Sequence, residues 1–274
     1  MANRGVSVVV PTFNRGHYIE ECLDSLLGQT LRAEEIIVVD DGSQDDTAER
    51  LKRYRQEIRY MRKENGGKPS ALNLAMNHVR GRYVWIFDDD DVALPDAIER
   101  RIAVMDRRPE LGFVYSGHYL GQDDEGGKIK REKLYRLPEV PEAEIFLSLM
   151  KGCYFTLPSM LVRTSAYRNA GPFDETLVSS EDYDMMLRLA HRFQGTALAA
   201  PTFIVRQHAG QRGPPNQRYS ERERQTVFRH FDQIVGRKIR MTVPLGDYLS
   251  PRRADVGPPQ IEREALLSRM VVMA

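Results

Sequence analysis

The chain has 274 residues, 41% of them hydrophobic, so it can bury a large core in one α/β domain or in two smaller domains. Its 40 Lys and Arg residues balance 39 Asp and Glu residues, which argues against a nucleic-acid-binding protein with a chain-wide positive field. No apolar run approaches the roughly 18 residues of a membrane span, and the first residues do not resemble a secretion signal. We therefore expect a cytoplasmic protein without a transmembrane segment. Two cysteines, Cys22 and Cys153, are too few for a disulfide scaffold or a zinc module.

The first 116 residues alternate between strand and helix signals. Apolar, mostly β-branched runs predict strands at residues 6–10, 35–39, 58–61, 83–87 and 112–116. Between them, apolar residues recur at helical spacing, as in the stripe formed by Ile19, Cys22, Leu23 and Leu26. Strands separated by helices predict right-handed crossovers and a mostly parallel sheet covered on both faces.

The second half loses this alternation. We expect a polar loop at 117–127, followed by a Lys/Arg-rich stretch to residue 136. Helices are predicted at 141–150, 165–170 and after residue 180, strands at 157–163 and 203–206, a mobile loop at 207–218 and a charged helix at 219–239. Beyond residue 241 the composition becomes rich in Pro and Arg, which suggests a loosely attached tail.

Polar residues follow three of the predicted parallel strands, at 11–14, 40–43 and 88–91. Because parallel strands bring their carboxyl ends to one edge of the sheet, these segments should converge on a ligand site. Neither G-x-G-x-x-G nor G-x-x-x-x-G-K-[ST] follows the first strand, which disfavours a dinucleotide dehydrogenase and a P-loop enzyme.

Four consecutive aspartates end the strand at 83–87. On an extended chain Asp88 and Asp90 point to one side, whereas Asp89 and Asp91 point to the other. Mg²⁺ and Mn²⁺ bind one or two protein carboxylates and leave other positions to water and substrate phosphates. A solvated acidic turn before the helix that Pro95 opens explains these four residues equally well.

Five segments, in this order, resemble the motifs of family 2 glycosyltransferases; they are residues 8–15, 38–43, 65–67, 88–91 and 180–183. The resemblance spans residues 5 to 210 and implies the GT-A fold. It also implies inverting transfer of a sugar, of the hexosyltransferase type, from a nucleotide-sugar donor to a carbohydrate or other hydroxyl acceptor, with Mn²⁺ or Mg²⁺. We expect a UDP-sugar as donor and a role in polysaccharide biosynthesis. In this reading residues 1–240 form one GT-A domain, with a nucleotide-binding half (1–116) and an acceptor half with lid (117–240), followed by a tail (241–274).

The resemblance assigns nucleotide contacts to nine residues, which are Pro11, Thr12, Asn14, Asp40, Asn65, Gly66, Lys68, Asp88 and Asp89. Among them, Asp40 matches the carboxylate that accepts a hydrogen bond from the base. By the same resemblance Asp90 and His208 contact the metal. Ordinary turns, a solvated lysine and a surface or core histidine are the alternatives for these positions.

Asp182 matches the general base of the family's Glu-Asp motif. With Ser179 as helix N-cap, the same aspartate could instead complete a capping box. A register shift would make Asp89 and Asp91 the metal pair instead of Asp88 and Asp90. Two arginines, Arg206 and Arg212, could add positive charge near the diphosphate.

Two other classes of protein fit the acidic strand ends. A nucleotidyltransferase or phosphatase also uses acidic metal sites, and a non-catalytic nucleotide-sugar binding module would keep the pocket without the reaction. Whether the protein forms a homodimer is left open.

Overall fold

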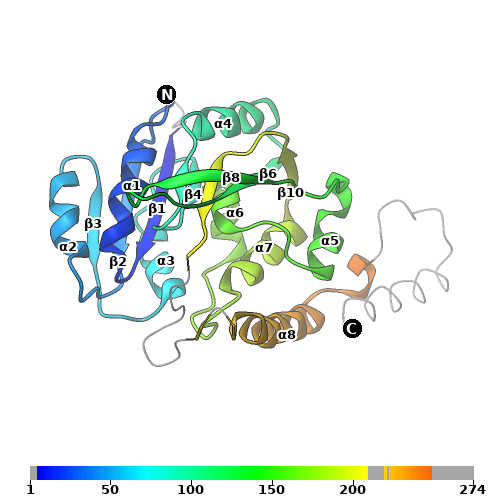
Figure 1. Ribbon diagram of the computed structural model, residues 1–274. Helices are drawn as coiled ribbons and strands as arrows, with labels where there is room; N and C mark the ends of the chain where they lie inside the picture. Colours follow the sequence, from blue (N-terminus) through cyan, green and yellow to red (C-terminus); the bar gives the residue numbers. More distant parts are fainter. Residues whose placement is uncertain (1–4, 209–218, 221, 249–274) are drawn as a thin grey trace.

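The computed structural model describes residues 5–208, 219–220 and 222–248. Its larger sheet has seven strands in the order β10-β6-β9-β4-β1-β2-β3 (Figure 1). Four neighbouring strands run parallel, and they are β3 (Arg59–Arg62), β2 (Glu35–Asp40), β1 (Val6–Thr12) and β4 (Tyr83–Ile86). The predicted mostly parallel α/β sheet is confirmed.

The crossovers of this half are helical. They contain α1 (Gly16–Leu27), α2 (Thr47–Arg50) with a 3-10 turn (Leu51–Tyr54), α3 (Lys68–Met76) and α4 (Ala97–Arg107). The strands are buried on both faces because alternate residues face opposite layers. Val9 belongs to the core beneath α3, whereas Val8 and Val10 belong to the core beneath α1 and α4.

The second half extends the same sheet with one reversed strand. β9 (Met160–Arg163) lies antiparallel between β4 and β6 (Leu111–Ser116), and β10 (Gln194–Leu198) lies parallel to β6 at the edge. Residues Leu157–Ser159 form a 3-10 turn, so the strand predicted at 157–163 is shorter than expected. β10 was not predicted. Its Gly195 leaves room for the ring of Phe113, which a Cβ would meet at 2.2 Å.

A second sheet has the strand order β5-β11-β7-β8, where β5 is Val92–Ala93 and β11 is Phe203–Arg206. β7 (His118–Asp123) and β8 (Ile129–Tyr135) form an antiparallel hairpin, so the prediction of a polar loop at 117–127 is wrong. β8 is an edge strand with mostly exposed charged side chains, and it therefore lacks the apolar alternation that marks a half-buried strand. The turn closes at Gly127, whose φ of 75° suits glycine.

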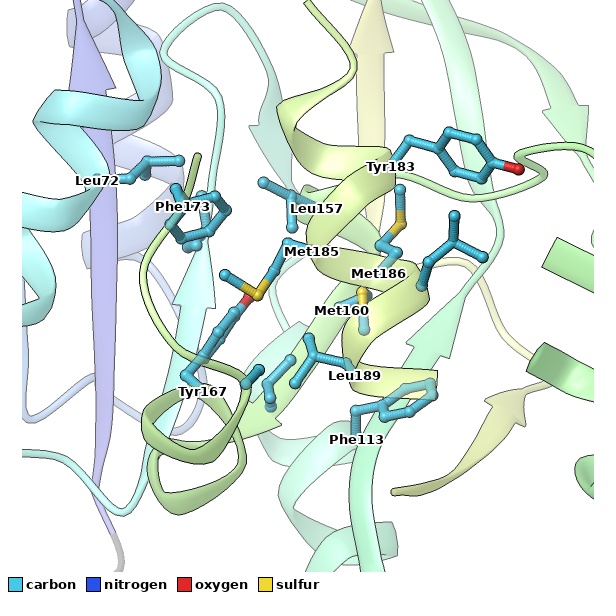
Figure 2. Packing of buried hydrophobic residues seen from close by; sticks show 14 of the residues in the cluster. Leu72, Phe113, Leu157, Met160, Tyr167, Phe173, Tyr183, Met185, Met186 and Leu189 are labelled. Atoms are coloured by element: carbon cyan, nitrogen blue, oxygen red, sulfur yellow. The ribbon is translucent and has the colours of Figure 1, made fainter. Parts of the chain in front are cut away.

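Helices of the second half cover one face of the large sheet. They are α5 (Ile145–Lys151), preceded by a 3-10 turn (Glu142–Glu144), α6 (Thr164–Ala170), α7 (Glu181–Arg192) and α8 (Arg224–Thr242), which is followed by a 3-10 turn (Leu245–Tyr248). Figure 2 shows Met185, Met186 and Leu189 of α7 packed among side chains of this core, including Met160 and Phe113.

The chain remains packed beyond the predicted domain boundary at residue 240. Val243 and Tyr248 are buried in the core around α7 and α8. Residues 249–274, most of the predicted tail, lie outside the described residues, as does the greater part of the loop predicted at 207–218. Within the described ranges, no helix is both long enough and apolar enough to cross a bilayer.

Candidate active site

The carboxyl ends of β1, β2 and β4 meet at one edge of the large sheet. Thr12 at the end of β1 is the register partner of Asp40 at the end of β2. On the other side of β1, the backbone N–H of Phe87 donates to the carbonyl of Val9 at 2.9 Å, which brings Asp88 to the same edge. The predicted convergence of the three polar segments is confirmed.

Asp40 is fully buried and held in a fixed orientation. Its Oδ1 accepts a hydrogen bond from the Ser43 N–H at 2.7 Å, and its Oδ2 accepts one from the Tyr60 hydroxyl at 2.7 Å. Arg62 Nε lies 3.8 Å from Oδ2. A carboxylate oriented in this way can select, by its geometry, the N–H or O–H group that donates a hydrogen bond to it.

The loop of Asn65, Gly66 and Gly67 is organised by Asp41, a residue that the sequence reading did not single out. Its carboxylate accepts hydrogen bonds from the N–H of Gly66 at 3.0 Å and of Gly67 at 2.7 Å. The Asn65 side-chain amide donates to the Asp41 carbonyl at 2.9 Å. Two adjacent glycines expose this backbone to a ligand. Asp41 could have been found from the sequence because it is an acidic residue directly after Asp40.

Asn14 joins the end of β1 to the loop after β2. Its backbone adopts a φ of 53°, and its amide oxygen accepts a hydrogen bond from the N–H of Gln44 at 2.7 Å. Its own N–H donates to the Ser43 hydroxyl at 2.9 Å. Pro11 pairs in register with Val39. The segment predicted to contact the nucleotide is thus tied to the strand end that carries Asp40.

The four aspartates alternate between an open and a buried side. The side chains of Asp88 and Asp90 are 31% and 15% exposed, whereas Asp89 and Asp91 are buried. Burial and the charge of Asp90 raise the pKa of both Asp89 and Asp91 well above the usual range. Asp89 lies near Thr12 and Arg15, which lower its pKa in part. This alternation favours Asp88 and Asp90 over the shifted register.

Asp90 and His208 lie together at the open side. Asp90 Oδ2 is 2.9 Å from His208 Nε2, so one oxygen and one nitrogen that can ligate a metal lie next to each other. The ring of Tyr18 from α1 lies 5.4 Å from the His208 ring. Two protein donors fit Mn²⁺ or Mg²⁺, which take their other ligands from water and phosphates. The described residues contain no cluster of three or more metal-ligating side chains.

Lys68, at the start of α3, connects the strand end with α7. Its Nζ lies 2.6 Å from Asp88 Oδ1 and 4.0 Å from Glu181 Oε1. Burial lowers the pKa of Lys68, but the two carboxylates outweigh it and the net pKa is raised. The lysine is therefore a permanent cation between the two halves of the site, and the alternative of a merely solvated lysine is wrong.

Asp182 is the second residue of α7. The helix begins at Glu181, and its N-cap Ser180 has a left-handed backbone (φ 60°) without a side-chain capping bond. The capping box with Ser179 is therefore absent, and Asp182 Oδ1 accepts a hydrogen bond from the N–H of Tyr183 at 2.8 Å. Burial raises the pKa of Asp182 and of Glu181, while Lys68 partly lowers both.

Arg206 takes part in an ion-pair network. Its guanidinium is completely buried and pairs with Glu21 and Asp123. Its Nε donates to the carbonyl of Asp90 at 2.8 Å, so the arginine lies behind the acidic segment, and whether its charge acts near the diphosphate stays a prediction. Arg212, for which the same role was expected, lies outside the described residues.

Comparison with known proteins shows the family of the chain. Residues 7–170 match the family model described as glycosyl transferase family 2. An uncharacterised glycosyltransferase of Rickettsia prowazekii is 34% identical over 194 residues, which are 67% of this chain and 58% of the relative. The chain belongs to glycosyl transferase family 2. Its match spans between 27% and 58% of the length of the first five curated relatives.

Solved structures show the same fold. TarS 1-349 of S. aureus in complex with UDP-GlcNAc aligns with a TM-score of 0.65 at 21% identity, covering 97% of this chain and 72% of TarS 1-349. The mannosyltransferase PcManGT from Pyrobaculum calidifontis, in complex with GDP-Man and Mn²⁺, aligns with a TM-score of 0.53 at 17% identity, covering 99% and 70% of the two chains. The fold is that of the GT-A glycosyltransferases, and the expectations of this fold and of membership in family 2 are confirmed.

Proposed function

We propose that this protein is an inverting, metal-dependent glycosyltransferase that moves a sugar from a UDP-sugar to an acceptor hydroxyl, with Asp182 as the general base. The observation that carries the proposal is the position of Lys68, 2.6 Å from Asp88 and 4.0 Å from Glu181. Through these two contacts Lys68 connects the acidic start of α7 with the strand ends, where a nucleotide binds in this type of sheet.

The donor nucleotide is assigned to the strand-end residues. Asp40 accepts a hydrogen bond from the base, and the exposed backbone of Gly66 is bonded to the next residue, Asp41. Thr12, Asn14 and Pro11 line the end of β1, with Asp88 and Asp89 across from them. Lys68 supplies a fixed positive charge toward the phosphates, a role that suits a point charge on a flexible stem. The complex of TarS with UDP-GlcNAc supports a uridine nucleotide.

Asp90 and His208 would hold the divalent cation, and PcManGT with bound Mn²⁺ supports metal use in this fold. A bound divalent cation neutralises negative charge on the departing diphosphate. Asp88 is assigned to the donor side instead, where its Oδ1 lies 2.6 Å from Lys68 Nζ. The choice between Mn²⁺ and Mg²⁺ is part of the test below.

Asp182 removes the proton from the acceptor hydroxyl as its oxygen attacks the anomeric carbon. The raised pKa of Asp182, caused mainly by burial, makes it a stronger base than a solvated aspartate. Because a single base activates the attacking oxygen and the diphosphate leaves from the opposite face, the reaction inverts the anomeric configuration. The acceptor is a carbohydrate or another hydroxyl compound, as in polysaccharide assembly.

The experiment has two stages. A thermal-shift screen with UDP-, GDP-, dTDP- and CDP-sugars, each with Mn²⁺, with Mg²⁺ and without metal, identifies the donor, because a ligand that binds only the folded state raises its stability. The donor is then incubated with candidate hydroxyl acceptors, and the anomeric proton of the product is followed by NMR. A product of inverted configuration is the expected result.

Three other outcomes would refute the proposal. Retention of configuration excludes the single displacement. Release of a nucleoside monophosphate or of phosphate without a glycosyl product indicates a nucleotidyltransferase or phosphatase. Binding of UDP with metal, with neither transfer nor slow donor hydrolysis, indicates a binding module.

A further inference from the structure

Arg206 contacts two consecutive residues of the acidic segment, Asp90 and Asp91. Its Nε donates a hydrogen bond to the carbonyl oxygen of Asp90 at 2.8 Å. Its backbone N–H donates to Oδ1 of Asp91 at 3.0 Å. A single residue at the end of β11 therefore sets the position of two consecutive residues of the acidic segment.

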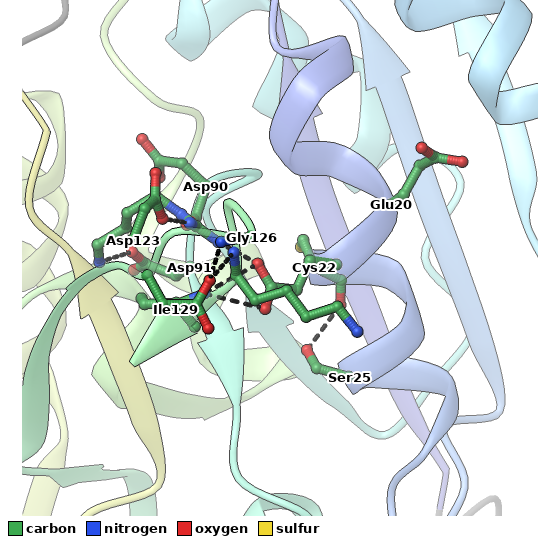
Figure 3. A network of polar contacts seen from close by, with 12 residues as sticks. Glu20, Cys22, Ser25, Asp90, Asp91, Asp123, Gly126 and Ile129 are labelled. Atoms are coloured by element: carbon green, nitrogen blue, oxygen red, sulfur yellow. Dashed lines mark hydrogen bonds and ion pairs between the residues drawn. The ribbon is translucent and has the colours of Figure 1, made fainter. Parts of the chain in front are cut away.

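The same guanidinium is held from two other elements. It pairs with Glu21 of α1 and with Asp123 of β7, and it lies over the ring of Tyr18 at 4.5 Å. Figure 3 shows Asp90, Asp91 and Asp123 gathered at this network. The Arg206 side chain is fully buried, so its geometry is set by these contacts and not by solvent.

Glu21 also connects the network to the hairpin. Its Oε1 accepts a hydrogen bond from the N–H of Ile129, the first residue of β8, at 3.2 Å. Asp123 is the last residue of β7. Both strands of the hairpin are therefore bound, through Glu21 and Asp123, to the arginine that holds Asp90.

We propose that Arg206 is a positioning residue for the metal site. It keeps Asp90 and His208 in place relative to each other, and it anchors the β7–β8 hairpin to them. The inference rests on the proposed function, because it assumes that Asp90 and His208 bind the cation. His208 follows Arg206 by two residues, so a shift of Arg206 moves both donors. Residues behind metal ligands typically change metal affinity by about 10-fold to 100-fold when they are mutated.

Arg206→Lys tests this role. Lysine keeps the positive charge but cannot donate at once to Asp90, Glu21 and Asp123 in the planar geometry of a guanidinium. The readout is the Mn²⁺ concentration at which half of the UDP-induced thermal shift is reached. We expect this midpoint to rise about 10-fold or more, while the shift produced by UDP without metal stays unchanged.

Arg163→Lys is the matched control. Arg163 lies on β9, where its guanidinium donates to the carbonyls of Leu111 at 2.6 Å and Met105 at 2.8 Å. The Arg163→Lys variant loses guanidinium hydrogen bonds to backbone carbonyls without touching the acidic segment. We expect a lower melting temperature and an unchanged Mn²⁺ midpoint. A midpoint that moves equally in both variants would show that general destabilisation, not positioning, is responsible.

A second variant covers the case in which Arg206→Lys does not fold. Asp123→Asn keeps the shape of the network and removes the charge of its partly exposed carboxylate. We expect a rise of the Mn²⁺ midpoint that is smaller than that of Arg206→Lys, because only one of the contacts of the arginine is weakened. An unchanged midpoint in every folded variant of the network overturns the inference. A wild-type protein whose UDP response is independent of Mn²⁺ refutes instead the metal step of the proposed function.

Discussion

The ammonium group of Lys68 lies 2.6 Å from the carboxylate of Asp88, at the point where the nucleotide half meets α7. Glu181 Oε1 lies 4.0 Å from the same nitrogen. The lysine thus neutralises one acid from each half and keeps the two acidic segments from repelling each other across the site. We therefore expect substitution of Lys68 to affect both donor binding and turnover.

Lys68→Met should weaken UDP binding by about 10-fold, because the diphosphate loses a cation and meets the uncompensated charges of Asp88 and Glu181. Isothermal titration with UDP and Mn²⁺ measures the change. Lys133→Met, on the exposed face of β8, is the control and should leave the affinity unchanged. Equal affinities for wild type and Lys68→Met would remove Lys68 from the donor site.

Asp182→Asn should lower kcat by about 100-fold to 10,000-fold, because the amide cannot accept the acceptor's proton. UDP affinity with Mn²⁺ should stay within about 2-fold of wild type, since the substitution is isosteric and lies on the acceptor side. Asp106→Asn is the control. Asp106 accepts a hydrogen bond from the Tyr83 hydroxyl at 2.8 Å, away from the strand ends. Near-normal turnover in Asp182→Asn would assign the base to another residue.

Asp90→Asn and Asp89→Asn together test the register of the metal pair. Asp90 is on the open side beside His208, so its amide variant should lose the Mn²⁺-dependent part of the UDP thermal shift. Asp89 is buried, and burial with the charge of Asp90 raises its pKa, so a neutral amide should be tolerated there. A reversed pattern, with Asp89→Asn the sensitive variant, would show that the register is shifted by one.

His118→Phe should reduce the sensitivity of the fold to acid. Burial lowers the pKa of His118 to about 4 from 6.5, and its Nδ1 has no partner among the described residues. Between pH 6.5 and pH 4 the unfolded chain therefore binds a proton that the folded protein does not. The stability linked to His118 is complete above pH 6.5 and is lost as the pH falls toward 4.

Urea unfolding of wild type and His118→Phe at pH 7.5 and pH 4.5 measures this effect. Comparing the two proteins isolates His118 from the carboxylates, which titrate in both. The loss on acidification should be smaller in the variant by about 2 to 3 kcal/mol. The phenyl ring can keep the stacking on Tyr135, whose ring lies 4.8 Å away. Identical losses in both proteins would show that His118 is protonated in the folded state.

The nucleotide half could be predicted well because its signals are strong and independent of the rest of the chain. Buried parallel strands are continuous apolar runs, and parallel pairing forces Asp40 and Asp88 to one edge. The hairpin was missed for the opposite reason. β8 lies at an edge with mostly exposed charged residues, so its sequence has the composition of a loop.

The finer geometry of the site depends on contacts between distant residues. Neither the left-handed backbone of Ser180 nor the partners of Arg206 have a local signature. Arg206 and Glu21 are 185 positions apart, and only the folded chain brings them together. A sequence can therefore place an arginine near an anion site without revealing that carboxylates already occupy it.

The reversed direction of β9 determines which of its ends lies near the carboxyl ends of β1, β2 and β4. Because β9 runs opposite to β4, the residues that open β9 reach the reactive edge, whereas those that close it point to the far edge. Desolvation by the surrounding protein atoms, and next the charge of Asp182, raise the pKa of the Cys153 thiol, so this opening segment lies within electrostatic range of Asp182. Under the proposed function, we therefore expect substitutions at 152–159 to alter the choice of acceptor without changing the strands proposed to bind the donor.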